Sequence, residues 1–130
     1  MSLYLDYNAS APILPEVLDV MIDAYKNVPG NADSRTHVFG TNAKKIVQTS
    51  RNTIAEILGV DKSEIIFTSG STESNNTVIL GIEEYAEQTG KKHIITTAIE
   101  HKSILEPLKY LEKKGFKVDY VKPDKSGRVN

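Results

Sequence analysis

The chain has 130 residues, of which 39% are hydrophobic and 25% charged, with a formal net charge of -1. This composition is typical of a globular domain, and the absence of cysteine excludes disulfides and thiolate metal sites within these residues. No apolar run approaches the ~18 residues of a membrane span, and the balanced charge argues against a nucleic-acid or membrane partner. Because no signal peptide opens the chain, we expect a cytoplasmic location.

The first elements expected are a strand and a helix. Residues 4–7 read as a short strand. A helix begins at Pro15, because a proline at the first helical position loses no hydrogen bond there. Its apolar face extends to the turn at residues 29–31, where proline and glycine end it. A polar loop over residues 31–40 follows.

The middle of the chain predicts a helix, a strand and a second helix. Residues 41–58 carry one apolar stripe, and Gly59 is expected to end that helix. Residues 64–68 then read as a strand. The next helix covers about residues 72–88, and because residues 78–82 are apolar on most sides we expect it to be buried.

The last part of the chain alternates strands with a helix. Strands are expected at residues 93–97 and 116–121, a helix at residues 104–114, and a turn at residues 123–127. Strands that alternate with helices through short connections indicate an α/β fold with a mostly parallel sheet flanked by helices.

The strongest local motif is the run FTSGSTESNN at residues 67–76. A buried strand is expected to end here, small residues turn the backbone, and a helix begins. The first N–H groups of a helix have no partner within it, and the helix dipole places partial positive charge there. The amides and hydroxyls of Ser71 and Thr72 can therefore cradle a phosphate. The alternative is an ordinary Ser/Thr helix cap, and a nucleotide P-loop is excluded because no lysine follows Gly70.

The second motif is TAIEHKS at residues 97–103. It follows the next strand, so we expect it at the same edge of the sheet as Ser71 and Thr72. His101 can act there as a general acid or base or stack on a flat ligand. The alternative is a surface histidine at a helix start. Glu100 and Lys102 are expected to face solvent or to pack at the helix start.

Other polar features carry weaker signals. The loop over residues 30–40 can line a site or a subunit contact, or simply connect two helices. His93 opens a strand and is interpreted as structural. The histidines lack the HExxH spacing of zinc enzymes, so we expect no metal site.

Four motifs in order resemble the class-V aminotransferase family, and most closely its NifS-like cysteine desulfurase branch. They are YLDYNASAP at residues 4–12, GNADSRTH with the following Gly40 at residues 30–40, TSGSTESNN at residues 68–76, and IEHKS at residues 99–103. Two departures are mild: Ser10-Ala11 stands where the family often has two threonines, and Ser71 where it often has alanine.

The resemblance implies a homodimeric enzyme that depends on pyridoxal 5'-phosphate (PLP), with the aspartate-aminotransferase-like fold (fold type I). It implies that Ser71 and Thr72 bind the cofactor phosphate, and that His101 stacks on the pyridine ring and moves protons. The implied reaction converts L-cysteine to alanine and an enzyme-bound persulfide. That sulfur then passes to acceptors such as iron–sulfur scaffolds or tRNA-thiolation proteins.

In the family, the Schiff-base lysine, the aspartate on the pyridine nitrogen and the nucleophilic cysteine all lie beyond the equivalent of Asn130. We therefore expect residues 1–130 to be a single partial domain: an N-terminal segment of about residues 1–15 and the start of the PLP-binding large domain. Such a fragment is expected to be inactive alone and to bind PLP weakly or not at all.

Alternatives remain open at this point. A selenocysteine lyase or another class-V enzyme carries the same motifs in this region. A non-catalytic half-length protein would keep the phosphate turn as a binding module without needing His101. A serine hydrolase is disfavoured, because Gly70-Ser71 lacks the GxSxG spacing and no third catalytic group stands out.

Overall fold

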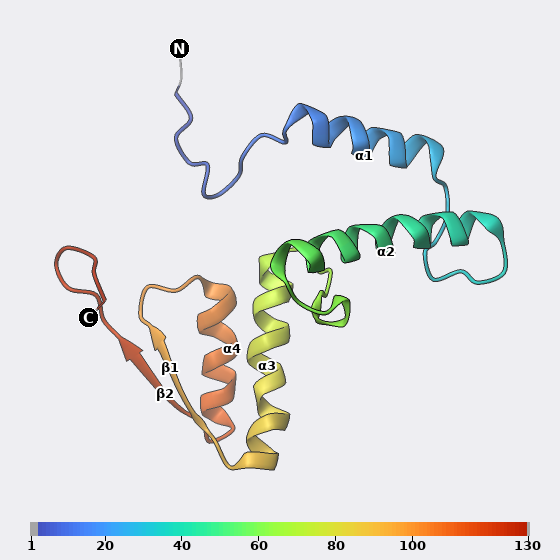
Figure 1. Ribbon diagram of the computed structural model, residues 1–130. Coiled ribbons are helices and arrows are strands. Elements are labelled where there is room, and N and C mark those ends of the chain that lie inside the picture. Colours follow the sequence, from blue (N-terminus) through green and yellow to red (C-terminus); the bar gives the residue numbers. More distant parts are fainter. Residues whose placement is uncertain (1–2, 130) are drawn as a thin grey trace. The chain divides into compact units, whose positions relative to one another are not determined.

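The computed structural model describes residues 3–129, and the chain divides into two compact units, Met1–Ile66 and Phe67–Asn130. We call these the N-terminal unit and the C-terminal unit (Figure 1). The N-terminal unit contains the helices α1 and α2 and the short 3-10 helix η1. The C-terminal unit contains α3, β1, α4 and β2. In residues 3–129 no helix has both the length and the apolar character that a bilayer span requires.

The two long helices of the N-terminal unit follow the sequence expectations. Helix α1 (Pro15–Asn27) begins at the predicted proline. Helix α2 (Val38–Leu58) starts three residues earlier than expected, because the side chain of His37 caps it. Gly59 ends α2 in the left-handed conformation, with φ at 67°, and its N–H bonds to carbonyls of the last turn.

Two strands predicted before α3 are wrong. The strand expected at residues 4–7 is absent: residues 4–6 have no regular structure and a turn covers residues 7–9, with the Asp6 carbonyl accepting hydrogen bonds from the Tyr4 hydroxyl and the Ala9 N–H. The strand expected at residues 64–68 is also absent: η1 (Lys62–Glu64) takes its first residue, and a capping box on Asp61 stabilises that turn. Residues 65–68 have no regular secondary structure and no strand beside them among residues 3–129, and a strand needs a hydrogen-bonded neighbour.

The C-terminal unit is a βαβ unit with one further helix. Helix α3 (Ser71–Thr89) precedes β1 (His93–Thr97), and α4 (Lys102–Lys113) connects β1 to β2 (Lys117–Val121). The two strands pair in parallel over their whole length. This confirms the expected α/β class, with strand and helix bounds within two residues of those predicted.

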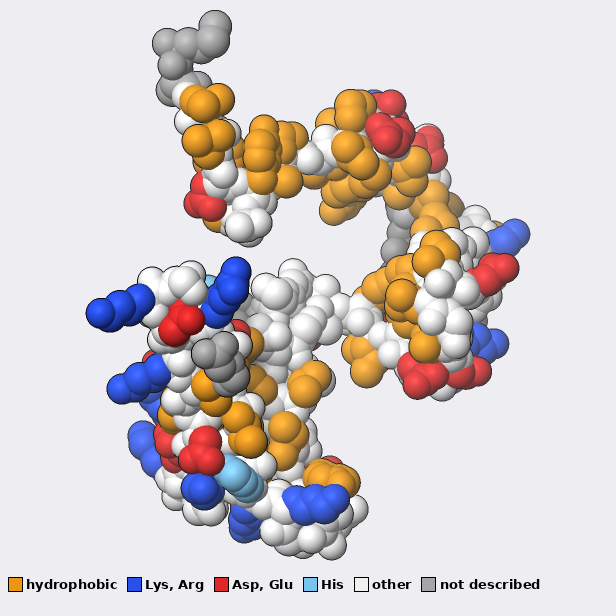
Figure 2. Space-filling model, turned by 60° about the vertical axis from the view of Figure 1, so that its left-hand side comes forward, with side chains coloured by type: hydrophobic (Ala, Val, Ile, Leu, Met, Phe, Trp, Pro, Cys, Tyr) orange, Lys and Arg blue, Asp and Glu red, His pale blue; other side chains and the backbone are white. Residues whose placement is uncertain are grey.

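The core of the C-terminal unit lies between its helices and its sheet. Ala86, Leu108, Leu111 and Phe116 are buried, and the partly buried Ile79, Ile82, Ile94, Ile104 and Val118 pack against them. Figure 1 shows α3 and α4 side by side next to β1 and β2. The N-terminal unit has little burial, and Figure 2 shows hydrophobic side chains over much of its visible surface.

The expectation that α3 is buried on most sides is wrong. Ile79 and Ile82 face the core, but Val78 is 66% exposed and Leu80 is 40% exposed. The reason is that α3 contacts α4 along one side only. The apolar run therefore does not correspond to a single buried surface in this structure.

Candidate functional site

The turn before α3 is built by hydrogen bonds between its own residues. The Glu73 carboxylate folds back and accepts the Ser69 N–H and the Ser69 hydroxyl, both at 2.6 Å. The hydroxyls of Thr68 and Ser74 lie 2.7 Å apart. The hydroxyl and then the N–H of Ser69 lower the pKa of Glu73 below its ordinary value of 4.5. These bonds hold the backbone in the sharp turn that leads into the helix.

The start of α3 leaves donors open at the predicted phosphate site. The N-cap residue is Gly70, so no side chain caps the helix. Ser71 and Thr72 occupy the first two helical positions, and both side chains are exposed. Among the described residues, neither hydroxyl nor either amide N–H of this pair has a hydrogen-bond partner. Free amides and hydroxyls at the positive end of a helix fit the phosphate of PLP.

The second motif starts α4 at the carboxyl end of β1. The Ala98 N–H bonds to the Val121 carbonyl, which extends the strand pairing by one residue. Thr97 donates its hydroxyl to Glu100 Oε1 at 2.7 Å, so Glu100 is half-buried and packs at the helix start. Of the two positions expected for Glu100, facing solvent or packing at the helix start, the structure shows the second. Lys102 is exposed and faces solvent, which is the first of these two positions.

His101 is the N-cap of α4. Its Nδ1 accepts the backbone N–H of Ser103 at 3.1 Å and lies 2.9 Å from the Ser103 hydroxyl. The Ser103 hydroxyl in turn accepts a hydrogen bond from Asn75 Nδ2 at 2.9 Å. The cap explains why α4 begins two residues earlier than expected.

The structure brings the two motifs to the same end of the C-terminal unit. Asn75 lies one turn along α3 from Ser71, and it bonds to Ser103, two residues from His101. The starts of α3 and α4 are therefore neighbours. Asn75 and Ser103 were not predicted from the sequence, although both lie inside the quoted motifs. Two sequence signals could have pointed to them: Ser103 follows His101 by two residues, and Asn75 follows Ser71 by four, about one helical turn.

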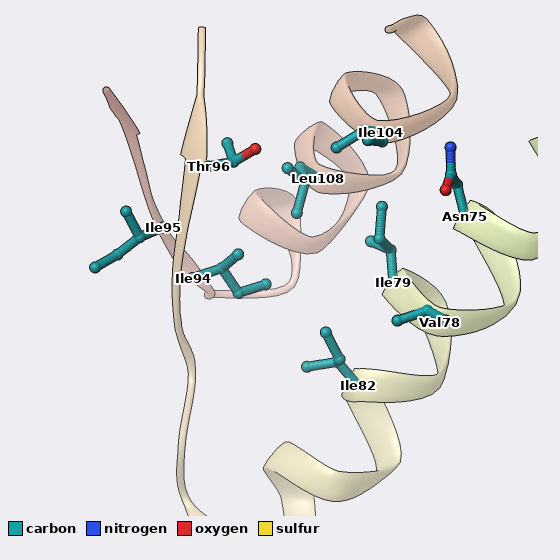
Figure 3. Close-up of a pocket in the computed structure, with 9 residues that line it drawn as sticks. All are labelled: Asn75, Val78, Ile79, Ile82, Ile94, Ile95, Thr96, Ile104 and Leu108. Carbon is teal, nitrogen blue, oxygen red and sulfur yellow. The ribbon is translucent and has the colours of Figure 1, made fainter. Parts of the chain in front are cut away.

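An apolar groove lies beside this end of the unit (Figure 3). It has a volume of about 310 Å³ and runs between α3, β1 and α4. Figure 3 shows Asn75 at its edge and isoleucines along its walls. The groove offers shape and apolar surface, while the polar groups of the site are at the helix starts. It is lined by Asn75, Val78, Ile79, Ile82, Ile94, Ile95, Thr96, Ile104 and Leu108.

The loop over residues 30–40 is closely packed within the N-terminal unit. A side chain at Gly40 would clash with the Ser34 carbonyl, and one at Gly30 would clash with the Phe39 carbonyl. His37 Nδ1 accepts the Gly40 N–H at 3.2 Å, and His37 Nε2 lies 2.9 Å from the Ser34 hydroxyl. The loop is thus held by contacts among its own residues, although most of its side chains are exposed.

The remaining histidine is structural, as its position in the sequence indicated. His93 opens β1, and its Nε2 lies 2.7 Å from Asp119 on the neighbouring strand. The hydrogen bond from His93, followed by that from Lys117, lowers the pKa of Asp119. Among residues 3–129 no group of three His, Asp or Glu side chains is placed to hold a metal ion.

Comparison with known proteins identifies the family. The family model for class-V aminotransferases matches residues 3–130. The mitosomal cysteine desulfurase of Trachipleistophora hominis is 43% identical over 129 residues, which cover 98% of this chain and 29% of that protein. A solved structure named as a NifS-like protein is 44% identical, with a TM-score of 0.88 over 100% of this chain and 35% of its own. The structure of SspA in complex with cysteine is 36% identical, with a TM-score of 0.85 over 99% of this chain and 37% of its own.

The chain thus spans about a third of the length of the relatives it matches. The agreement with the NifS-like structure confirms the expected α/β fold, which this chain shares with that protein along its whole length. Since the family model covers nearly every residue, the chain belongs to the class-V aminotransferase family.

Proposed function

We propose that this chain is the N-terminal part of a PLP-dependent cysteine desulfurase, which converts L-cysteine to alanine and an enzyme-bound persulfide. The observation that carries the proposal is the helix start of α3, whose donors are open and which lies beside the His101 end of α4. The names of the mitosomal relative and of the cysteine-bound structure support the substrate. Residues 1–130 then comprise an N-terminal segment of about residues 1–15 and the start of the PLP-binding domain.

Each site residue has a defined task under this proposal. Ser71 and Thr72 bind the cofactor phosphate through their amides and hydroxyls. His101 covers the ring and exchanges protons through Nε2, the ring nitrogen not used by the helix cap. When bound, PLP supplies the electron sink for the carbanion of the substrate. A homodimer and a sulfur-acceptor protein are proposed partners.

The cytoplasmic location expected from the sequence stays a prediction. A relative that is 43% identical is named as mitosomal. Fluorescence microscopy of the tagged protein in its own cell decides the compartment.

Thr72→Val tests the phosphate site. Valine keeps the shape of the side chain but removes the hydroxyl, so PLP should bind about 10- to 100-fold more weakly, since a hydrogen bond to a charged group contributes about 1.5–3 kcal/mol. Affinity is measured by titrating PLP into the full-length protein and following its absorbance. Thr77→Val is the matched control, because within residues 3–129 the Thr77 hydroxyl bonds only to the Glu73 carbonyl of its own helix.

The activity itself is tested by supplying L-cysteine and measuring alanine and persulfide. Formation of both products, at a rate lowered by Thr72→Val and not by Thr77→Val, is the expected result. If the PLP-loaded protein turns over selenocysteine but leaves cysteine unchanged, the enzyme is a selenocysteine lyase and not a cysteine desulfurase. Equal PLP affinity in both variants would remove Thr72 from the phosphate site.

A further inference from the structure

Three residues form a continuous hydrogen-bonded chain between α3 and α4. Asn75 Nδ2 lies 2.9 Å from the Ser103 hydroxyl, which lies 2.9 Å from His101 Nδ1. Ser103 is buried, with 7% of its surface exposed, and Asn75 is half-buried. Hydrogen bonds shielded from water in this way are stronger than exposed ones and can hold a side chain in one orientation.

The direction of each bond follows from the backbone. The Ser103 N–H can only donate, so His101 Nδ1 must be the acceptor and carries no proton. The Ser103 hydroxyl then also donates to Nδ1, and its lone pairs accept from Asn75. Neutral His101 is thereby held in the tautomer with its proton on Nε2. Among the described residues, Nε2 has no hydrogen-bond partner of its own.

We propose that Asn75 and Ser103 are positioning residues that fix the ring orientation and the tautomer of His101. The proposal rests on the proposed function, in which His101 exchanges protons through Nε2. An imidazole whose Nδ1 is unconstrained divides its population between two tautomers and rotates about its side-chain bonds. The chain from α3 removes that freedom, so that a single nitrogen is presented to the ligand before it binds.

The Asn75–Ser103 bond also joins α3 to α4, so the test must distinguish a purely structural role of this bond from the positioning of His101. Asn75→Asp makes the separation possible, since aspartate has nearly the same shape. Its carboxylate can only accept, so it draws the Ser103 hydroxyl proton away from His101 Nδ1. Ser103→Ala removes the hydroxyl altogether, and Ser103→Thr restores it at the same position.

The direct test is a long-range proton–nitrogen NMR experiment on the full-length protein labelled at histidine, with the His101 signals assigned by their loss in His101→Gln. In the unaltered protein, Nε2 should carry the proton and Nδ1 should show an acceptor shift. Asn75→Asp and Ser103→Ala should both move the Nδ1 resonance, and Ser103→Thr should return it. Asn76→Ala is the matched control, because Asn76 bonds to the Thr72 carbonyl of its own helix. The His101 nitrogen shifts should be the same in this variant as in the unaltered protein.

A proton on Nδ1 in the unaltered protein overturns the proposal, and so do equal shifts in the Asn75 and Asn76 variants. This readout does not depend on turnover, so it stands even if cysteine is not the substrate. With L-cysteine, kcat should fall about 2- to 10-fold in Ser103→Ala, the loss expected for one neutral hydrogen bond, and recover in Ser103→Thr. A protein that shows the tautomer but makes no alanine refutes the desulfurase and leaves the positioning chain intact.

Discussion

At the residue scale, two histidines of this chain begin helices in the same way. His37 Nδ1 accepts the Gly40 N–H at the start of α2, and His101 Nδ1 accepts the Ser103 N–H at the start of α4. Each leaves Nε2 on the far side of the ring. At His37 that nitrogen lies 2.9 Å from the Ser34 hydroxyl, while at His101 it has no partner among residues 3–129. The same local cap is therefore structural in one case and available to a ligand in the other.

Glu73 provides a pH-dependent test of the turn before α3. Ser69→Ala removes the hydroxyl hydrogen bond, the larger cause of the lowered pKa, so the pKa of Glu73 should rise toward 4.5. Because the folded-state pKa is the lower one, the stabilising effect of this carboxylate is complete above pH 4.5 and is lost as the pH falls through the folded-state value. Carbon NMR of the Glu73 carboxyl during an acid titration measures both values. An unchanged titration in Ser69→Ala would contradict the hydrogen bonds described.

At the element scale, α3 shows how much of a helix is set by its own residues. It begins at an uncapped glycine, and Gly90 ends it with φ at 72°. Gly81 lies inside the same helix, where an added side-chain carbon would meet no atom within 4 Å. Gly90, the C-cap, therefore has a backbone conformation that favours glycine, whereas Gly81 has a helical conformation that any residue can adopt.

Alanine at these two glycines should change stability in opposite directions. Gly81→Ala should raise the free energy of unfolding by about 0.5–1 kcal/mol, because it lowers the entropy lost by an interior helix residue. Gly90→Ala should lower it by about 1–2 kcal/mol, since a side chain is strained in the left-handed conformation. Urea denaturation of both variants gives the comparison. Stabilisation by Gly90→Ala would show that the helix does not end as described.

At the scale of the whole molecule, the two units differ in how much they bury. The C-terminal unit encloses Leu108 and Leu111, with 2% and 0% of their surfaces exposed. The N-terminal unit leaves most large hydrophobic side chains of α1 exposed. Global stability of the described structure therefore depends mainly on the packing of α3, α4 and the two strands.

Leu111→Ala tests that dependence. It should lower the free energy of unfolding by about 2–5 kcal/mol, because a fully buried leucine loses its contacts and leaves a cavity. Val78→Ala, at a side chain 66% exposed on α3, is the control and should have a far smaller effect. Both are measured by denaturant unfolding followed by circular dichroism. Equal losses in the two variants would contradict the assigned core.

The sequence by itself determined the four helices, both paired strands, the family motifs and the choice of Ser71, Thr72 and His101. Each of these depends on local rules: apolar periodicity, proline and glycine positions, and residues adjacent in the chain. The roles of those three residues remain predictions.

Tertiary structure decided what depends on distant partners. Residues 64–68 form no strand without a neighbour to pair with, and Val78 is exposed because α3 packs on one side only. The Asn75–Ser103 bond joins residues 28 apart, a separation that only folding brings within 2.9 Å.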